Sequence, residues 1–474
     1  MCGPICLCLK TRLFIPRSIA RKVQEMAIES TTNDTRDYPL RVQGFIKSNR
    51  IKPRNQSEPS ATPETFRSRA RFFSLLQPQL RQLDEPSLVS SLHGKIGRIL
   101  FTIPAWVFTA TSDPIVQKYN QAFRSIIQSL PSSTKVTVLT HENATQAAER
   151  FLASAGVVNA RAEIVSAPNT MQFTVWAEDA YSVCDDLNDQ ETYLVEPASF
   201  RRWDDALIAD QVAPKTNLET TQVPLYFQGG NILIGDDFWM IGADYPINSL
   251  NMDLVIPQSG ETERQAIERV YGKYLDRNRK LHVVGSRLPV PSKLVRTIQI
   301  GGENWNEILY YGNLASTVQP LFHIDMFISL AGRNDSGKYT VLVGDPQMAA
   351  DVLEQQLPDG AMKEVFDDIA NQLTSLGFNV VRNPLPLVYD DDDESRTRIW
   401  YFATSNNAII QDKPKVVWLP TYGHGLWSQL WATDERNKEI WESLGYEVKQ
   451  LADFHPFAAN LGAAHCISKY IARN

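Results

Sequence analysis

The sequence predicts a mixed α/β domain built from five similar units. Helical and strand signals alternate from about residue 95 to the end of the chain. Two predicted helices end in nearly the same way, at SLGFNV and SLGYEV, where Gly377 and Gly445 fit the left-handed position that closes a helix. A polar cluster followed by a β-hairpin also recurs. Together these observations favour internal repetition.

The predicted helices are recognised by apolar residues spaced three and four positions apart. This spacing predicts helices over residues 115–130, 267–275, 362–376 and 440–444. The recurring polar clusters read WAEDAYSV, FQGGNILI, FHIDMFISL, ATSNNAII and AAHCISKYI. Each of the first four leads into an apolar strand that reverses at a turn signal, and the fifth closes the chain.

The polar clusters contain side chains that could meet in one pocket. In a radial arrangement of repeats, equivalent strand positions converge on a central channel. The converging positions hold Asp179, Gln228, Asn231, His323, Asp325, Asn407 and Cys466. This set comprises a cysteine, a histidine, two carboxylates and several amides. Such a set is typical of an active site and not of an ordinary apolar core.

Residues 1–94 are predicted to be an N-terminal extension or linker that is largely disordered. The stretch 47–71 has three prolines and few aliphatic residues. Residues 1–24 carry five basic residues and no acid, which fits organelle targeting and equally fits a dispensable extension. Three cysteines near the start are interpreted as incidental thiols, because no partner ligands follow at zinc-site spacing.

Composition argues against several kinds of partner. The 474-residue chain has a net charge of −7, so it lacks the basic footprint of a nucleic-acid-binding protein. The sequence has no run of 18 apolar residues, so it predicts neither a membrane span nor a membrane partner. Five cysteines, an odd number, do not form a disulfide framework and favour a reducing, cytoplasmic location. The oligomeric state is left open.

His323, Asp325 and Cys466 are the candidates for chemistry. On a strand, residues two apart face the same side, so His323 and Asp325 are predicted to point together. An ordinary hydrogen-bonded pair is the alternative. Cys466 is either a buried, inert thiol or a nucleophile. Its neighbour His465 is predicted to face the other way on a strand, which favours His323 as the base.

Asp179 is either a turn residue or part of a binding site for a cation. A planar guanidinium matches carboxylate geometry, and Asp179 and Asp325 could hold one from two sides. Two carboxylates would raise the pKa of the Cys466 thiol, and a bound cation would offset that effect. The glycine pair before Asn231 fits a close backbone approach and lacks the spacing of a phosphate loop.

These motifs, in this order, resemble those of the guanidine-modifying pentein superfamily, and most of all agmatine deiminases and bacterial-type protein-arginine deiminases. W-A-E-D at 176–179 is similar to W-x-R-D, and Q-G-G-N at 228–231 to E-G-G-N/D. His323-Ile-Asp325 matches the family motif H-x-D. Asn407, in the stretch SNNAII, resembles an asparagine that the deiminases carry at a hairpin. L-G-A-A-H-C-I-S at 461–468 resembles G-G-x-x-H-C-I-T. The resemblance covers residues 95–474.

The resemblance implies a pentein catalytic domain over 95–474, an α/β propeller of five-fold pseudosymmetry made of ββαβ units. Asp179 and Asp325 would bind the guanidinium, Cys466 would attack its carbon, and His323 would transfer protons. The remaining substrate-binding residues would be Trp176, Gln228, Gly230, Asn231 and Asn407. The expected reaction converts a guanidine to a ureido group plus ammonia through a Cys-bound intermediate. No metal and no organic cofactor is expected.

Two positions depart from the family pattern. Glu178 stands where the family has arginine, and Gln228 stands where it has glutamate. Gln228 can bond to His323 but cannot stabilise an imidazolium by charge. Two alternatives therefore stay open: an amidinotransferase that uses an amine acceptor, and a degenerate pentein that only binds a cation or a protein partner. The expected substrate is a small cationic guanidine or the arginine side chain of a peptide.

Overall fold

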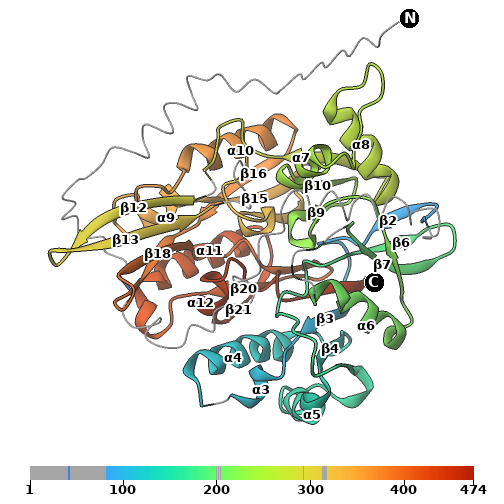
Figure 1. The fold of residues 1–474 in the computed structure, drawn as a ribbon, viewed down its shortest axis with the longest axis horizontal. Helices are drawn as coiled ribbons and strands as arrows, with labels where there is room; N and C mark the ends of the chain where they lie inside the picture. Colours follow the sequence, from blue (N-terminus) through green and yellow to red (C-terminus); the bar gives the residue numbers. More distant parts are fainter. Residues whose placement is uncertain are drawn as a thin grey trace, which may run out of the picture.

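The computed structural model describes residues 82–474 apart from 111, 199, 201, 203, 292 and 312–317, together with the short strand β1 (Arg41–Val42). Most of the predicted extension over 1–94, including its basic start at 1–24 and three of its cysteines, lies outside the described residues. Helices and strands alternate along the described chain (Figure 1), which confirms the prediction of an α/β fold. None of its helices is both long and apolar enough to cross a membrane.

Five small sheets in this part of the chain share one plan: an antiparallel pair of strands followed by a parallel neighbour. Three of the sheets contain β6 (Ser182–Asp186), β7 (Glu191–Glu196) and β8 (Glu219–Gln222); β9 (Ile232–Ile234), β10 (Phe238–Gly242) and β11 (Lys280–Val284); and β14 (Ile328–Arg333), β15 (Tyr339–Asp345) and β16 (Asn379–Pro384). The other two contain β19 (Ile409–Asp412), β20 (Lys415–Thr421) and β21 (Glu447–Asp453); and β22 (Lys469–Arg473), β3 (Ile96–Thr102), β4 (Lys135–His141) and β5 (Ala162–Ala167). The four predicted hairpins are therefore confirmed.

The two ends of the packed chain meet in one sheet. The last strand, β22, pairs antiparallel with β3. Lys95 and Asn474 exchange two backbone hydrogen bonds of 2.8 and 2.9 Å. The packed chain begins before residue 95, because β2 (Pro86–Leu88) pairs with β6 and Leu83 is buried.

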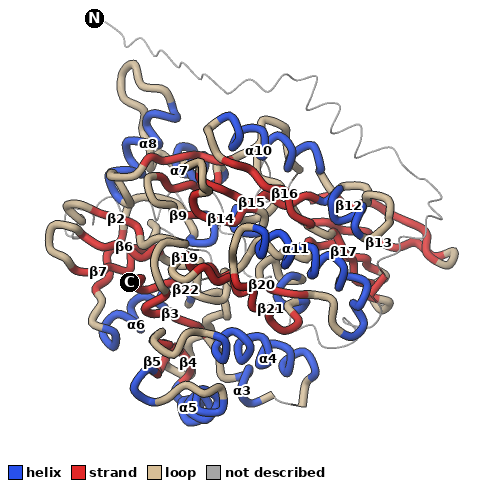
Figure 2. Tube along the Cα trace, turned by 180° about the vertical axis from the view of Figure 1, so that it is seen from behind, coloured by secondary structure: helices blue, strands red, loops and turns tan. Residues whose placement is uncertain are grey.

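Helices connect the parallel strands of these sheets. They are α3 (Trp106–Thr109), α4 (Pro114–Ser129), α5 (Thr145–Ser154), α6 (Ile208–Thr216), α7 (Asp244–Asn251), α8 (Glu263–Tyr274), α9 (Pro346–Val352), α10 (Lys363–Ser375) and α11 (Trp431–Ser443), and α12 (His455–Ala458) follows β21. In Figure 2, α4, α5, α6, α8 and α10 lie at the periphery, with most strands between them. The four predicted helices correspond to α4, α8, α10 and α11. Gly377 and Gly445 have the predicted positive φ, +98° and +83°.

A sixth sheet is an addition that the repeat pattern did not predict. It contains β1, β12 (Lys293–Ile300), β13 (Glu303–Tyr310), β17 (Leu387–Asp392) and β18 (Thr397–Phe402). Its buried glutamate, Glu307, accepts a 2.7 Å hydrogen bond from Trp400 Nε1 and pairs with Arg296. These contacts join β13 to its two neighbours, β18 and β12, within the sheet.

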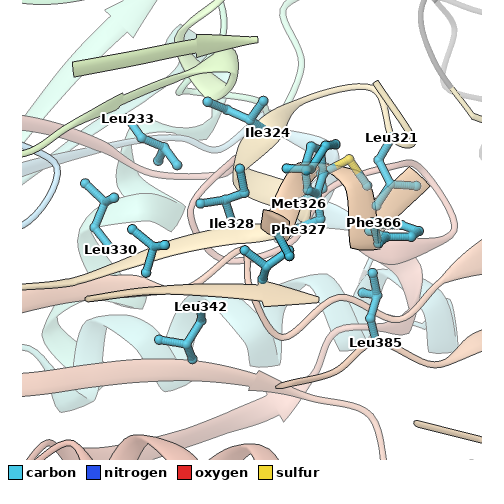
Figure 3. Packing of buried hydrophobic residues seen from close by; sticks show 14 of the residues in the cluster. Leu233, Leu321, Ile324, Met326, Phe327, Ile328, Leu330, Leu342, Phe366 and Leu385 are labelled. Atoms are coloured by element: carbon cyan, nitrogen blue, oxygen red, sulfur yellow. The ribbon is translucent and has the colours of Figure 1, made fainter. Parts of the chain in front are cut away.

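The largest apolar core lies directly beneath one of the polar clusters. Ile324, Met326 and Phe327 pack among buried leucines and isoleucines of neighbouring strands (Figure 3). The two residues that flank Asp325 are therefore held by apolar burial, which fixes the direction of the turn that carries it.

Candidate active site

The predicted site residues lie in turns that precede the first strands of the hairpins. They come from the turns ahead of β6, β9, β14, β19 and β22. The side chains of Asp179, Gln228, Asn231, His323, Asp325, Asn407 and Cys466 are at most 3% exposed. The fold thus brings together residues that span almost 290 positions of sequence.

The predicted strand geometry around His323 and Asp325 is wrong. Residues Ile324–Met326 form a single 3₁₀ turn, and β14 begins only at Ile328. The turn arises because Ile324 and Met326 are both buried in the core and the Ile324 backbone N–H donates a 3.0 Å hydrogen bond to Asn231 Oδ1. His323 and Asp325 nevertheless reach the same site.

Cys466 is held by Asn407. The Asn407 Nδ2 group lies 3.0 Å from Cys466 Sγ. Asn407 Oδ1 accepts 3.0 Å hydrogen bonds from the backbone N–H groups of Ala463 and Cys466. Burial, followed by the charges of Asp325 and Asp179, raises the pKa of the Cys466 thiol well above its usual value. Without a nearby cation, the sulfur is therefore protonated at neutral pH.

His323 has one engaged and one open nitrogen. Its Nε2 lies 2.9 Å from Gln228 Oε1 and 3.1 Å from the Tyr245 hydroxyl. Its Nδ1 lies 3.6 Å from Asp179 Oδ1, which is too far for a hydrogen bond. Burial lowers the pKa of His323, although Asp179 and Asp325 oppose this effect. The open nitrogen of a neutral imidazole is available to exchange a proton.

The two aspartates have matching surroundings. Asp179 Oδ2 accepts a 2.6 Å bond from Arg202 Nη2. Asp325 Oδ2 accepts a 2.8 Å bond from His465 Nδ1 and a 3.4 Å bond from Cys466 Sγ. The other oxygen of each carboxylate, Oδ1, is buried and has no hydrogen-bond partner among the described residues.

The position expected for His465 is also wrong. Because Cys466 lies in a turn rather than on a strand, the side chain of its neighbour is not forced to the opposite face. His465 is 4% exposed and bonds directly to Asp325. It is therefore part of the site.

Gly230, Asn231 and Trp176 shape the walls of the site. A Cβ atom on Gly230 would lie 2.6 Å from His323 Nδ1, so only glycine permits this close approach. Asn231 bonds to the backbone of Gly242 and Ile324 and thereby fixes two neighbouring turns. Trp176 is half-buried and packs on Gly462, whose own Cβ would lie 3.1 Å from Cys466 Cβ.

Glu178, which departs from the family motif, is paired with a buried cation, Lys469. Lys469 Nζ lies 2.7 Å from Glu178 Oε1 and donates a 3.2 Å hydrogen bond to the Glu178 carbonyl. Both side chains are almost fully buried. Burial raises the pKa of Glu178, and Lys469 and His465 oppose that shift. The acid at this position is therefore balanced locally.

His323, Asp325 and Cys466 offer ligand atoms that all lie within 4.8 Å of one another. Imidazole, carboxylate and thiolate are ligands that Zn²⁺ accepts. In the described part of the chain, this is the one group of three such residues close enough to hold a metal ion.

No family model and no curated protein matches this sequence. Solved structures do match its fold. Agmatine deiminase of C. jejuni has a TM-score of 0.53 at 12% identity, over 82% of this chain and 98% of that chain. A variant of that enzyme with substrate bound has a TM-score of 0.51 at 11% identity, over 82% and 97%. Agmatine deiminase of Enterococcus faecalis has a TM-score of 0.50 at 12% identity, over 81% and 95%.

The chain has the fold of these deiminases. The match covers 81–82% of this chain, and the deiminases align over nearly their whole length.

The Glu178–Lys469 pair gives a stability prediction. Lys469→Met leaves a buried carboxylate without its cation, so the free energy of unfolding should fall by about 3–5 kcal/mol. The double variant Glu178→Gln/Lys469→Met should recover most of this loss. Urea unfolding measures both changes. Lys449→Met, which breaks an exposed pair, is the control and should cost less than about 1 kcal/mol.

The raised pKa of Cys466 predicts slow alkylation at neutral pH. The rate of carbamidomethylation by iodoacetamide should keep rising through pH 9, because the thiolate fraction grows until the pH passes the pKa. Mass spectrometry of the peptide that contains Cys466 separates this thiol from the other four. A rate that levels off below pH 8 would contradict the prediction.

The three close ligand atoms predict inhibition by zinc. Micromolar Zn²⁺ should block alkylation of Cys466, and a chelator should restore it, because a metal-bound thiolate is a poor nucleophile toward iodoacetamide. Mg²⁺, which prefers oxygen ligands, serves as the control ion. Equal alkylation with and without Zn²⁺ would show that these side chains do not converge in solution.

Proposed function

We propose that this protein is a deiminase that hydrolyses the guanidine group of a small cationic substrate or of an arginine side chain. The observation that carries the proposal is the meeting of Cys466, His323 and two buried aspartates that each retain one unbonded oxygen. The shared fold with agmatine deiminases supports it.

Asp179 and Asp325 form the binding site for the cation. An unpaired buried carboxylate oxygen is costly, and a guanidinium N–H group satisfies it with a charge-assisted hydrogen bond. The cation also stabilises a thiolate, so substrate binding lowers the pKa of Cys466 and produces the nucleophile. Binding and activation are thereby linked.

The reaction then proceeds in two halves. In the first half, the Cys466 thiol proton is transferred to His323 and the sulfur forms a bond to the guanidinium carbon. The C–N bond breaks as His323 returns the proton to the leaving group, and ammonia departs. In the second half, His323 takes a proton from water and the hydroxide adds to the amidino-thioether carbon. The C–S bond then breaks, His323 returns its proton to the sulfur, and the protonated ureido group releases one proton to solvent. The products are a ureido compound and the free thiol.

The open Nδ1 atom of His323 is the nitrogen that carries these protons. Its Nε2 is held by Gln228 and Tyr245, so the ring keeps one orientation during both halves. Gln228 adds no charge, unlike the glutamate of the family motif. Asp179 and Asp325 supply the negative charge that favours the imidazolium.

Turnover of guanidines separates this proposal from its alternatives. The enzyme should release ammonia and a ureido product from at least one of agmatine, arginine and an arginyl peptide, measured by a colour reaction for the ureido group. Product that forms only with an added amine acceptor would identify an amidinotransferase. Ligand binding without turnover would identify a degenerate, binding-only protein.

The matched variants are Cys466→Ala and Cys184→Ala, because both residues are buried free cysteines. Cys466→Ala should reduce turnover by about a thousandfold or more, whereas Cys184→Ala should change kcat by less than about threefold. In the wild type, rapid acid quenching should trap the amidino group as a mass increase on the Cys466 peptide. Full turnover by Cys466→Ala would rule out the mechanism.

We also infer that the five small sheets are the blades of a five-fold pseudosymmetric propeller. The repeated strand pattern and the pairing of β22 with β3 support this inference. The catalytic domain then comprises the packed chain, with its start moved from residue 95 to about residue 82 to include β2. The cysteine content favours a reducing, cytoplasmic location.

A further inference from the structure

Each candidate substrate-binding aspartate is held by a protein side chain through one oxygen only. Arg202 bonds to Oδ2 of Asp179, and His465 bonds to Oδ2 of Asp325. In both carboxylates Oδ1 is buried and has no hydrogen-bond partner within the described part of the chain. The arrangement is the same on two turns that are far apart in sequence.

Arg202 does not depend on Asp179 for its position. Its Nε donates a 2.5 Å bond to Asp205 Oδ2, and its guanidinium lies 5.0 Å from the centre of the Phe200 ring. Asp205 is itself fixed by the backbone N–H and hydroxyl of Thr174, at 2.7 and 2.6 Å. Arg202 is therefore held by contacts other than the one to Asp179, and it would stay in place when Asp179 binds a substrate.

His465 is anchored independently of Asp325 as well. Its backbone N–H donates a 3.1 Å hydrogen bond to the Asn407 carbonyl, in the turn that also holds Cys466. Burial lowers the pKa of His465, but Glu178 and the bond to Asp325 outweigh this and raise it overall. Its Nδ1 lies 2.8 Å from Asp325 Oδ2 and donates the hydrogen bond to that carboxylate.

We propose that Arg202 and His465 are a pair of positioning residues that leave one oxygen each of Asp179 and Asp325 to bind the guanidinium. The proposal rests on the proposed function and adds to it the way in which the cation is bound. Each aspartate is held in one rotamer by its own hydrogen-bond donor, so the two free oxygens are preorganised at a fixed separation.

The unbonded oxygens of the two aspartates suit a cation better than a neutral group. Among the described residues, each aspartate keeps one buried Oδ1 without a hydrogen-bond partner. A planar guanidinium can give each of these oxygens a charge-assisted hydrogen bond, whereas a neutral amide or urea can give only the weaker neutral kind. The site therefore favours the substrate over the ureido product.

The test uses two alkylating probes of nearly equal shape. In both 2-chloroacetamidine and 2-chloroacetamide, the Cys466 thiolate displaces chloride and forms a C–S bond. Only the amidine carries a planar cation. The ratio of the two rate constants at the Cys466 peptide therefore measures how well the aspartates receive a cation, independently of turnover. The wild type should prefer the amidine.

Arg202→Met and His465→Leu should each lower this ratio by about tenfold or more, because the freed aspartate can rotate away. His465→Asn keeps an N–H donor near the position of Nδ1, so it should retain more of the preference than His465→Leu. Arg398→Met removes a buried arginine paired with Asp391 in the sixth sheet, and it should leave the ratio unchanged. Thermal unfolding checks that each variant is folded, and Arg202→Lys replaces Arg202→Met if the latter is not.

The outcomes separate this proposal from the proposed function. A wild type that shows no preference for the amidine and no turnover overturns the proposed function. A wild type that prefers the amidine, with ratios unchanged in the Arg202 and His465 variants, overturns only the positioning roles. If Arg398→Met lowered the rate ratio by the same factor, the effect would reflect general destabilisation. That result would also overturn the positioning roles.

Discussion

The burial of two aspartates beside a cysteine is the constraint on which the rest of the site depends. An ionised carboxylate is expensive to remove from water unless cations and hydrogen-bond donors compensate for the lost hydration. The chain supplies Arg202 to Asp179 and His465 to Asp325. The compensation is incomplete, because one oxygen of each carboxylate has no partner among the described residues. Burial, followed by the charges of Asp325 and Asp179, raises the pKa of Cys466.

The fold meets this constraint through side-chain hydrogen bonds that connect the turns of the site to one another. Asn407 bonds to the sulfur and the backbone of the Cys466 turn. Asn231 connects the turn ahead of β9 to the turn ahead of β14. Amide side chains suit this work because each offers a donor and an acceptor at once. The functional side chains are thus supported by backbone contacts that do not depend on a ligand.

The two departures from the family motif have different physical consequences. Glu178 replaces a cation with an acid, and the structure balances it with Lys469, so the change is compensated within one pair. Gln228 keeps the hydrogen bond to His323 but removes a charge. The basicity of His323 then depends on the two aspartates, which are also the proposed substrate-binding residues. Loading the site with a cation should therefore weaken the base and strengthen the nucleophile together.

The sequence by itself determined the α/β class, the four hairpins, the capping glycines and the set of residues that meet, because these depend on local periodicity and motif order. It failed where a side chain's direction depends on packing. The 3₁₀ turn at Ile324–Met326 and the turn at Cys466 exist because their apolar neighbours are buried, which no two-residue alternation reveals. Arg202, Tyr245 and Lys469 carried no signal, because the side chains that they contact at the site, Asp179, His323 and Glu178, belong to other motifs. Only the tertiary structure could show which charge each buried carboxylate meets, because desolvation and pairing arise when distant turns close on one another.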